Sequence, residues 1–137
     1  MSEVLGVTNG CFDGLHLGHI MMLEAARQQC DRLIVLLNSD ESVKRLKGKD
    51  RPLFDVLSRI ESLRENPDVD EVIVFGDSSP LDDPLPWIKQ LKPDKLFKGD
   101  DYTYDTIRGA DFVTENGGEV VIIPTRLDDY ASSLLHM

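Results

Sequence analysis

Short apolar runs alternate along this chain with segments whose apolar residues recur at helical spacing. The run Arg-Leu-Ile-Val-Leu-Leu-Asn at residues 32–38 is continuously apolar between its ends, which is typical of a central parallel strand buried on both faces. Further strands are predicted at residues 4–9, 71–75, 95–98 and 119–123. Helices are predicted between the strands, at residues 18–29, 40–46, 55–65, 87–91 and 106–116.

Polar residues and glycines mark several ends of these elements. Asp55 is suited to cap the helix that follows it, and Asn66-Pro67 would end that helix. Gly117-Gly118 would end the last helix. Because the chain has neither internal repeats nor a low-complexity tract, residues 1–137 are expected to form one domain.

Alternation of strands and helices predicts an α/β fold with right-handed crossovers and a parallel sheet covered on both faces. For five strands we expect the order 3-2-1-4-5 of Rossmann-like, doubly wound nucleotide-binding folds. In that order the first and fourth strands are neighbours at the switch point, where ligands bind beyond the carboxyl ends of the strands. The turns after these two strands are therefore predicted to face one crevice.

The turn between the first strand and the first helix carries the most specific pattern, Gly10-Cys11-Phe12-Asp13-Gly14-Leu15-His16-Leu17-Gly18-His19. The first turn of a helix has unpaired N–H groups and a partial positive charge, and glycines let a phosphate approach the backbone. His16 and His19 would add side-chain donors to this anion site. Two alternatives are that the histidines only cap and pack, or that they bind a metal. The metal alternative is weak because no third His or Cys lies nearby.

Composition narrows the class of protein. An apolar fraction of 41% and a charged fraction of 29% are those of a soluble globular domain. Neither a membrane-spanning run nor a secretory signal is present, and the cysteines, Cys11 and Cys30, do not suggest a disulfide framework, so we expect a cytoplasmic protein. Cys11 is expected to serve as a small packing residue within the turn.

The formal net charge of −10 argues against a nucleic-acid partner. An acidic protein that binds a triphosphate must gather its cations locally, with a divalent metal brought by the ligand. One segment gathers cations: Lys44, Arg45, Lys47, Lys49 and Arg51. The alternative for this segment is a solvated helix face or loop. The alternative for residues 98–102 is an ordinary polar turn.

The turn also resembles a known family. The pattern G-x-F-D-x-x-H-x-G-H, found here at Gly10, Phe12, Asp13, His16, Gly18 and His19, is the signature of the cytidylyltransferase-like nucleotidyltransferases. The chain looks most like the adenylyltransferase domain of the bifunctional ADP-heptose synthases, and next most like glycerol-3-phosphate cytidylyltransferases. The same resemblance includes Asn38-Ser39-Asp40, Arg51-Pro52, Arg59, Pro93-Asp94, Lys98-Gly99-Asp100-Asp101-Tyr102 and Asn116-Gly117-Gly118-Glu119-Val120.

The resemblance implies a reaction and its catalytic residues. A phosphate oxygen of the acceptor attacks the α-phosphate of a nucleoside triphosphate, and magnesium pyrophosphate leaves. His16 and His19 would donate to the phosphoryl oxygens on which charge builds. Lys47, rather than Lys44, would close on the triphosphate, and Arg59 would hold a phosphate in bidentate fashion.

The resemblance also implies ligand-binding residues. Nucleotide-binding residues would be Gly10, Cys11, Phe12, Asp13, Gly18, Lys98, Gly99, Asp101, Ser132 and Ser133. Acceptor-binding residues would be Asp13, Asp100 and Tyr102. Asp13 either orients the turn or lies near the metal, and the sequence leaves both open. Mg²⁺ would be held mainly by the triphosphate rather than by protein ligands.

The chain departs from the family pattern near its C-terminus. Ala131-Ser132-Ser133 stands where the family has Ser-Thr-Thr or Ser-Ser-Thr, and Arg126 is displaced from the arginine of the cytidylyltransferase pattern. These positions meet the nucleotide in the family, so the choice between ATP and CTP stays open.

The sequence predicts a nucleotidyltransferase that uses ATP and a sugar 1-phosphate, of the ADP-heptose type, with Mg²⁺. The alternative enzyme is a CTP:glycerol-3-phosphate cytidylyltransferase. The alternative of another class is a nucleotide-binding module without turnover, which the departures near the C-terminus would favour. The resemblance further implies a homodimer, and neither a nucleic acid nor a membrane is an expected partner.

Overall fold

Five parallel strands form the centre of this computed structural model, in which residues 3–77 and 82–124 are described. In sequence order the strands are β1 (Leu5–Gly10), β2 (Arg32–Asn38), β3 (Glu71–Phe75), β4 (Lys95–Gly99) and β5 (Glu119–Ile123). Their order across the sheet is β3-β2-β1-β4-β5, which confirms the predicted 3-2-1-4-5 arrangement.

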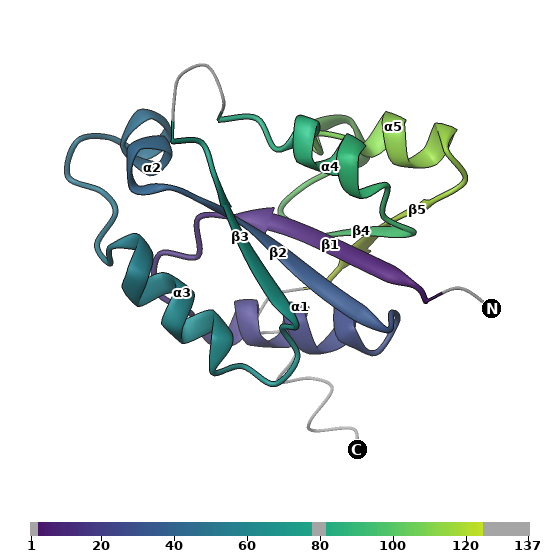
Figure 1. The fold of residues 1–137 in the computed structure, drawn as a ribbon, viewed down its shortest axis with the longest axis horizontal. Helices are drawn as coiled ribbons and strands as arrows, with labels where there is room; N and C mark the ends of the chain where they lie inside the picture. Colours follow the sequence, from purple (N-terminus) through teal and green to yellow (C-terminus); the bar gives the residue numbers. More distant parts are fainter. Residues whose placement is uncertain (1–2, 78–81, 125–137) are drawn as a thin grey trace.

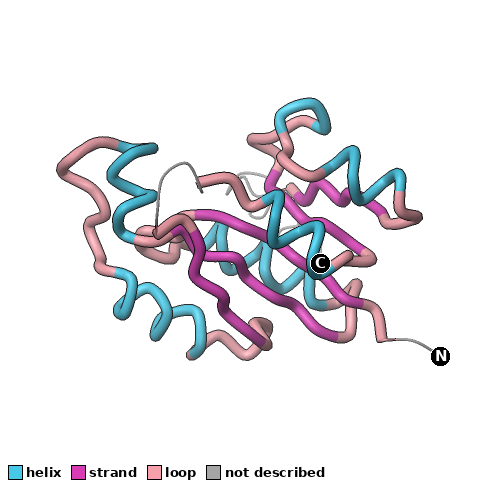
Figure 2. The backbone as a smooth tube through the Cα atoms, turned by 45° about the horizontal axis from the view of Figure 1, so that its top comes forward, coloured by secondary structure: helices cyan, strands magenta, loops and turns pink. Residues whose placement is uncertain are grey.

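Helices cover both faces of the sheet (Figure 1). One face carries α1 (Leu17–Arg27) and α3 (Val56–Arg64), and the other carries α4 (Leu85–Leu91) and α5 (Ala110–Glu115). The short helix α2 (Asp40–Lys47) follows β2 directly. The backbone trace in Figure 2 shows the twisted sheet between these helical layers.

The central strand β2 explains why the sheet is buried on both sides. Side chains of a strand alternate between its faces. Leu33, Val35 and Leu37 pack in the cluster that includes Leu23 of α1. Ile34 and Leu36 pack in the opposite cluster, with helices α4 and α5, and these β2 side chains are fully buried. The continuous apolar run at residues 32–38 therefore corresponds to a strand with two buried faces.

Two helix starts follow from polar side chains in the sequence. The side chain of Asp55 accepts a hydrogen bond from the Ser58 N–H at 2.9 Å, which confirms Asp55 as the N-cap of α3. Ser39 caps α2 in the same way, by accepting from the Ser42 N–H at 3.1 Å.

The segment predicted as one helix at residues 106–116 is different in the structure. A 3-10 turn, η1 (Tyr104–Thr106), comes first, and α5 begins only at Ala110. Gly109, with a φ of 90°, lies between them in the left-handed region, which a helix cannot pass through. A Cβ at this position would also approach Ile88 Cδ1 to 2.8 Å. Backbone conformation therefore decided this boundary, where the apolar pattern had indicated a continuous helix.

The order of the strands creates the crevice that the sequence predicted. β1 pairs in parallel with β2 on one side and with β4 on the other. The chain leaves β1 toward α1 on one face of the sheet, and it leaves β4 toward α5 on the other face. The turns after β1 and β4 thus diverge from neighbouring strands, as expected at a topological switch point.

Candidate active site

A cleft of about 710 Å³ lies at the carboxyl ends of β1 and β4. The turn after β1 contributes the largest part of its lining, and α2, the loop that follows α2, and the turn after β4 are among the other contributors. The lining residues predicted from sequence are Gly10, Cys11, Phe12, Asp13, His16, Gly18, His19, Lys47, Lys98, Gly99, Asp101 and Tyr102. Segments far apart in the sequence therefore meet in one site.

His16 and His19 form the start of α1. His16 is the N-cap residue, and its Nδ1 accepts a hydrogen bond from the His19 N–H at 3.3 Å. In return, the His16 N–H donates to Nδ1 of His19 at 3.4 Å. The two rings stack, with centroids 3.7 Å apart and an angle of 19° between their planes. This mutual capping satisfies two N–H groups of the first helical turn.

The capping geometry also determines what the rings can do in the cleft. Because Nδ1 of each ring is an acceptor, the neutral tautomer carries its proton on Nε2. Each imidazole therefore presents one N–H donor that the helix start does not use. The two interpretations of the histidines, capping residues and anion ligands, are compatible because they use different nitrogens.

His19 is neutral at pH 7. Burial lowers its pKa to about 4, and the neighbouring His16 lowers it further in the same direction, while Asp101 opposes the shift. The ring of Phe12, whose centroid is 5.1 Å from that of His19, contributes to this apolar surrounding. The site therefore offers a neutral hydrogen-bond donor here, and its positive charge comes from other residues.

Lys98 supplies a buried cation across the crevice from the histidines. Its Nζ donates to the carbonyl oxygen of Asn9 at 2.8 Å and lies 4.2 Å from the centre of the Tyr102 ring. Only 6% of the residue is exposed. Burial lowers the pKa of Lys98 to about 8, although Asp101 favours the charged form. An anion in the cleft would stabilise the ammonium.

Asp13 orients the loop that follows α2. Its carboxylate accepts hydrogen bonds from the Leu53 N–H at 2.7 Å, the Phe54 N–H at 2.9 Å and the Arg51 Nε at 3.1 Å. Burial alone would raise the pKa of Asp13, but these hydrogen bonds outweigh it and lower the pKa. Of the two roles that the sequence left open, these contacts favour orientation of the turn.

Arg59 is placed differently from its predicted role as a bidentate phosphate ligand. It is only 2% exposed, and its guanidinium donates within the protein. The acceptors are the carbonyl oxygens of Phe54, Cys11 and Asn38 and the carboxylate of Asp40, at 2.7 to 2.9 Å. A guanidinium already bonded to four acceptors cannot also clamp a phosphate, so the prediction for Arg59 needs correction.

The basic segment separates into residues with different surroundings. Lys47 and Arg51 line the cleft. Lys44 lines a separate hollow of about 470 Å³ instead. Arg45 donates from Nε and Nη2 to the Asp82 carboxylate and from Nη2 to the Gly76 carbonyl oxygen. Of the basic segment predicted from sequence, Lys47 and Arg51 therefore belong to the site. Arg51 already forms an ion pair with Asp13.

Several lining residues were not identified from the sequence: Thr8, Asn38, Asp82, Thr106 and Arg108. Arg108 forms an ion pair with Asp83 near the cleft. Sequence alone did not identify Arg108 as a cleft residue, because it placed this residue on a helix at 106–116, where an arginine is ordinarily exposed on the surface. The Thr8 hydroxyl is buried and has no hydrogen-bond partner among residues 3–77 and 82–124. The sequence could not predict this unpaired hydroxyl, because a threonine within an apolar strand is not unusual.

Three further points concern Asp100, the C-terminal serines and metal binding. Asp100 lies half-buried between the cleft residues Gly99 and Asp101. Ser132 and Ser133 lie outside the described residues. Within residues 3–77 and 82–124, no group of three or more His, Cys, Asp or Glu side chains could hold a metal ion. In the same ranges we find no helix with the length and apolar character needed to cross a membrane.

Sequence comparisons place the site in a wider context. A family model described as Cytidylyltransferase-like matches residues 7–133. Relatives named Bifunctional protein HldE include one from Hyphomonas neptunium, 53% identical over 120 residues, and one from Rhodospirillum rubrum, 53% identical over 118 residues. The alignments cover 88% and 86% of this chain but 24% and 23% of the relatives. The chain thus spans about a quarter of the length of these relatives.

Solved structures share the fold. A lipopolysaccharide core biosynthesis protein from Thermoplasma volcanium GSS1 superposes with a TM-score of 0.68 at 28% identity, covering 91% of this chain and 98% of that one. A pantoate-beta-alanine ligase from Francisella tularensis gives a TM-score of 0.65 at 17% identity, covering 90% of this chain and 60% of the ligase. The second likeness is one of fold alone.

Proposed function

The chain belongs to the cytidylyltransferase-like family of nucleotidyltransferases, and from this membership we propose that it joins a nucleoside monophosphate to a small phosphorylated acceptor. The nucleotide donor is ATP and the acceptor is a sugar 1-phosphate. The motif resemblance to the ADP-heptose synthases supports this pair of substrates.

One observation carries the proposal. Two imidazoles cap the same helix turn through Nδ1, and they line a cleft that Lys47 and Lys98 also line. Hydrogen-bond donors at the start of a helix, with cations in the same cleft, suit phosphoryl oxygens.

The reaction needs positioning and charge stabilisation more than proton transfer. A phosphate oxygen of the acceptor attacks the α-phosphorus, a new P–O bond forms, and the bond to the bridging oxygen breaks as pyrophosphate leaves. The acceptor phosphate is already an oxyanion, so no general base is required. His16 and His19 would donate to the α-phosphoryl and bridging oxygens as charge grows there, and Lys47 would neutralise the departing pyrophosphate.

Mg²⁺ is proposed to arrive with the triphosphate and to neutralise charge on its phosphates when bound. The donor set of the cleft fits such a carried ion, because Mg²⁺ of this kind needs only one or two carboxylates beside the phosphates. Asp101 lines the cleft and is our candidate ligand. Asp13 is less suited, because its oxygens already accept three hydrogen bonds.

Pyrophosphate release tests the proposal. The protein is incubated with Mg²⁺, with ATP or CTP, and with heptose 1-phosphate, other sugar 1-phosphates, glycerol 3-phosphate or phosphopantetheine. We expect release with ATP and a sugar 1-phosphate. Release with CTP and glycerol 3-phosphate, but not with ATP, would establish the cytidylyltransferase alternative. Nucleotide binding without release for any acceptor would establish a binding module.

We also propose a cytoplasmic homodimer. Both cysteines are free thiols, which suits a reducing compartment. Leu53, Phe54 and Leu57 are 66%, 51% and 72% exposed, so a contiguous segment presents large apolar side chains that a second copy could cover. Mass measurement in solution tests the dimer, and Leu57→Glu should shift the mass toward the monomer if this segment forms the interface.

A further inference from the structure

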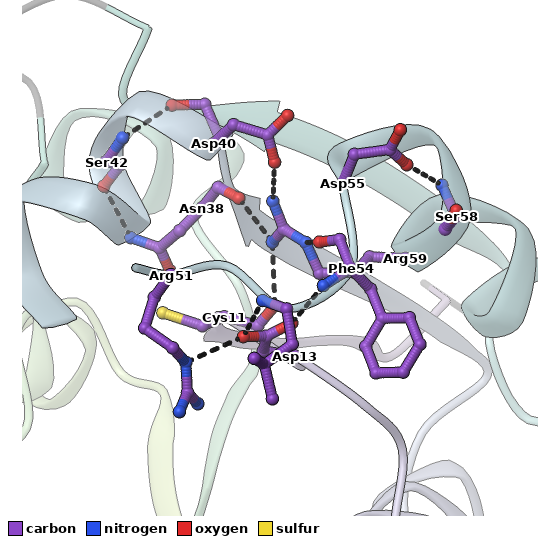
Figure 3. Close-up of polar contacts among 12 residues, drawn as sticks. Cys11, Asp13, Asn38, Asp40, Ser42, Arg51, Phe54, Asp55, Ser58 and Arg59 are labelled. Carbon is purple, nitrogen blue, oxygen red and sulfur yellow. Dashed lines mark hydrogen bonds and ion pairs between the residues drawn. The ribbon is translucent and has the colours of Figure 1, made fainter. Parts of the chain in front are cut away.

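A network of polar contacts, drawn in Figure 3, includes four residues that line the cleft: Cys11, Asp13, Asn38 and Arg51. It contains Asp13 and Arg59, to which the family resemblance assigned contacts with ligands. Both side chains instead bond to the backbone and to charged groups of the protein.

Arg59 joins three segments that are distant in the sequence. From its place on α3, the guanidinium donates to the carbonyl oxygen of Cys11 at 2.8 Å and to that of Asn38 at 2.7 Å. It also donates to the Asp40 carboxylate at 2.7 Å. Asn38 ends β2, and Asp40 is the first residue of α2. Arg59 therefore ties the turn after β1 to the start of α2.

Asp13 makes the reciprocal connection. From the turn after β1, its carboxylate accepts from Arg51 and from the N–H groups of Leu53 and Phe54. The carbonyl oxygen of Phe54 in turn accepts from Nε of Arg59 at 2.9 Å. Asp13 and Arg59 thus both bond to the backbone of the loop that follows α2. Figure 3 shows both side chains next to Phe54, whose N–H donates to Asp13 and whose carbonyl oxygen accepts from Arg59.

Lys47 lies between the two anchored points. It is the last residue of α2, whose first residue is bonded to Arg59. After it, the Arg51 N–H donates to the Gly48 carbonyl oxygen at 3.1 Å, which closes a short turn that leads to the Asp13 contact. These contacts connect both ends of the segment that carries Lys47 to the residues that bond to the turn after β1.

We propose that Arg59 and Asp13 are positioning residues that set the place of Lys47 relative to His16 and His19, an inference that rests on the proposed function of that cleft. Neither residue needs to touch the substrate. Phosphoryl transfer depends on groups held at the right distance from the reacting atoms, so a displacement of about 1 Å can cost on the order of 100-fold in rate. The Asp13 carboxylate and the Arg59 guanidinium are themselves buried, so the contacts of these two charges are costly to break, which resists such a displacement.

The test compares Asp13→Asn and Arg59→Lys with a matched pair at the other end of the sheet. Asp70 accepts from the Leu33 N–H at 2.8 Å and pairs with Arg27 at 2.9 Å, and Arg27 donates to the Cys30 carbonyl oxygen at 2.7 Å. Asp70→Asn and Arg27→Lys therefore remove the same kinds of contact far from the cleft. All four variants are assayed well below their melting temperatures.

We expect Asp13→Asn and Arg59→Lys to lower kcat on the order of 10- to 100-fold, with a smaller change in KM for the acceptor. Asp70→Asn and Arg27→Lys should keep the wild-type kcat, even if their melting temperatures fall as much as those of Asp13→Asn and Arg59→Lys. Lys47→Ala should also cost less activity in the Arg59→Lys background than in the wild type, because Lys47 is already displaced there. Equal kcat losses in the two pairs, or fully additive effects of Lys47→Ala and Arg59→Lys, would overturn the inference.

A readout without turnover separates this inference from the proposed function. Hydrogen exchange at the Leu53 and Phe54 amides and the ring resonances of His16 and His19 are measured in the free protein. Asp13→Asn should accelerate the exchange and shift the ring resonances, whereas Asp70→Asn should change neither. If the wild type releases no pyrophosphate, the proposed function fails. Unchanged exchange and resonances in Asp13→Asn would overturn the positioning role whether or not the wild type is active.

Discussion

The imidazoles of His16 and His19 each accept a hydrogen bond from the other residue's backbone N–H, at 3.3 and 3.4 Å, and the rings stack 3.7 Å apart. This reciprocity fixes both rings before any ligand arrives. The Nε2–H donors are therefore preorganised, and the free-energy cost of orienting them is met during folding rather than during the reaction. Structural and chemical roles reside on separate atoms of the same side chains.

The two roles of His16 can be separated by substitution. His16→Asn keeps a side-chain acceptor near the position of Nδ1 but removes the distal donor. Asparagine is a favoured N-cap residue, so we expect the free energy of unfolding to change by less than about 1 kcal/mol. The rate should fall much further, with kcat lower by about 100- to 1000-fold. Denaturant titration and the pyrophosphate assay measure the two quantities.

His16→Ala serves as the comparison, because it loses both functions. We expect it to be less stable than His16→Asn by about 1 kcal/mol and to be similarly slow. Both variants should bind nucleotide nearly as well as the wild type, since a transition-state contact affects turnover more than binding. Equal losses in kcat and in nucleotide affinity would argue against a transition-state role for His16.

His19 should give the protein a specific pH dependence. In the folded protein its pKa is about 4, against an ordinary value of 6.5. Between these values the unfolded chain binds more protons than the folded one, so the free energy of unfolding should fall as the pH drops from 6.5 through 4. NMR titration of the ring measures the pKa, and denaturant titration across this range measures the stability.

His19→Asn identifies this contribution. The variant should lack the ring that titrates near pH 4, and its free energy of unfolding should depend less on pH between 4 and 6.5. The chain has three histidines, so the variant also assigns the ring resonance. A ring that titrates near 6.5 in the wild type would contradict the buried, mutually capped arrangement.

The sheet could be derived from the sequence because its determinants are local. Apolar runs gave the strands to within a residue at each end, and the preference for right-handed crossovers gave their order. The crevice followed from that order, and with it the meeting of His16, His19 and Lys98. These inferences needed only side-chain periodicity and chain connectivity.

The role of Arg59 could not be derived in this way. Three of its four acceptors lie 5, 21 and 48 residues away and are backbone carbonyl groups, which every residue possesses; the fourth is the Asp40 carboxylate. No sequence pattern marks one carbonyl group as the partner of an arginine. The placement of Arg108 was missed for a related reason, since it depends on the left-handed conformation of Gly109. Long-range backbone contacts and local φ values are properties of the folded chain.

Lys98 should give the activity an alkaline limit. Because its pKa is about 8, raising the pH through this value removes the positive charge of Lys98 from the cleft of the free protein. We expect kcat/KM for the acceptor to decline above pH 8, as kcat/KM reports the ionisation of the free enzyme. Lys98→Arg should remove that decline, because a guanidinium stays charged.

Lys95→Arg is the control on the same strand. Lys95 pairs with Glu119 at the start of β4, at the opposite end from the cleft, so this variant should keep the wild-type profile. If kcat/KM of Lys98→Arg still declined above pH 8, the ionisation would belong to another group.

Lys47 and Lys44 provide the sharpest comparison of cations within α2. Both side chains are exposed and three residues apart, but only Lys47 lines the cleft, and Lys44 lines the separate hollow with Asp40 and Phe54. We expect Lys47→Ala to lower kcat/KM for the nucleotide by at least about tenfold, equivalent to roughly 1.4 kcal/mol of transition-state stabilisation. Lys44→Ala removes the same charge from the same helix and should change kcat/KM less than about twofold, which corresponds to a surface effect within 0.5 kcal/mol. If the two substitutions were equally costly, the general positive potential of α2 would explain nucleotide binding, and a specific contact from Lys47 would not.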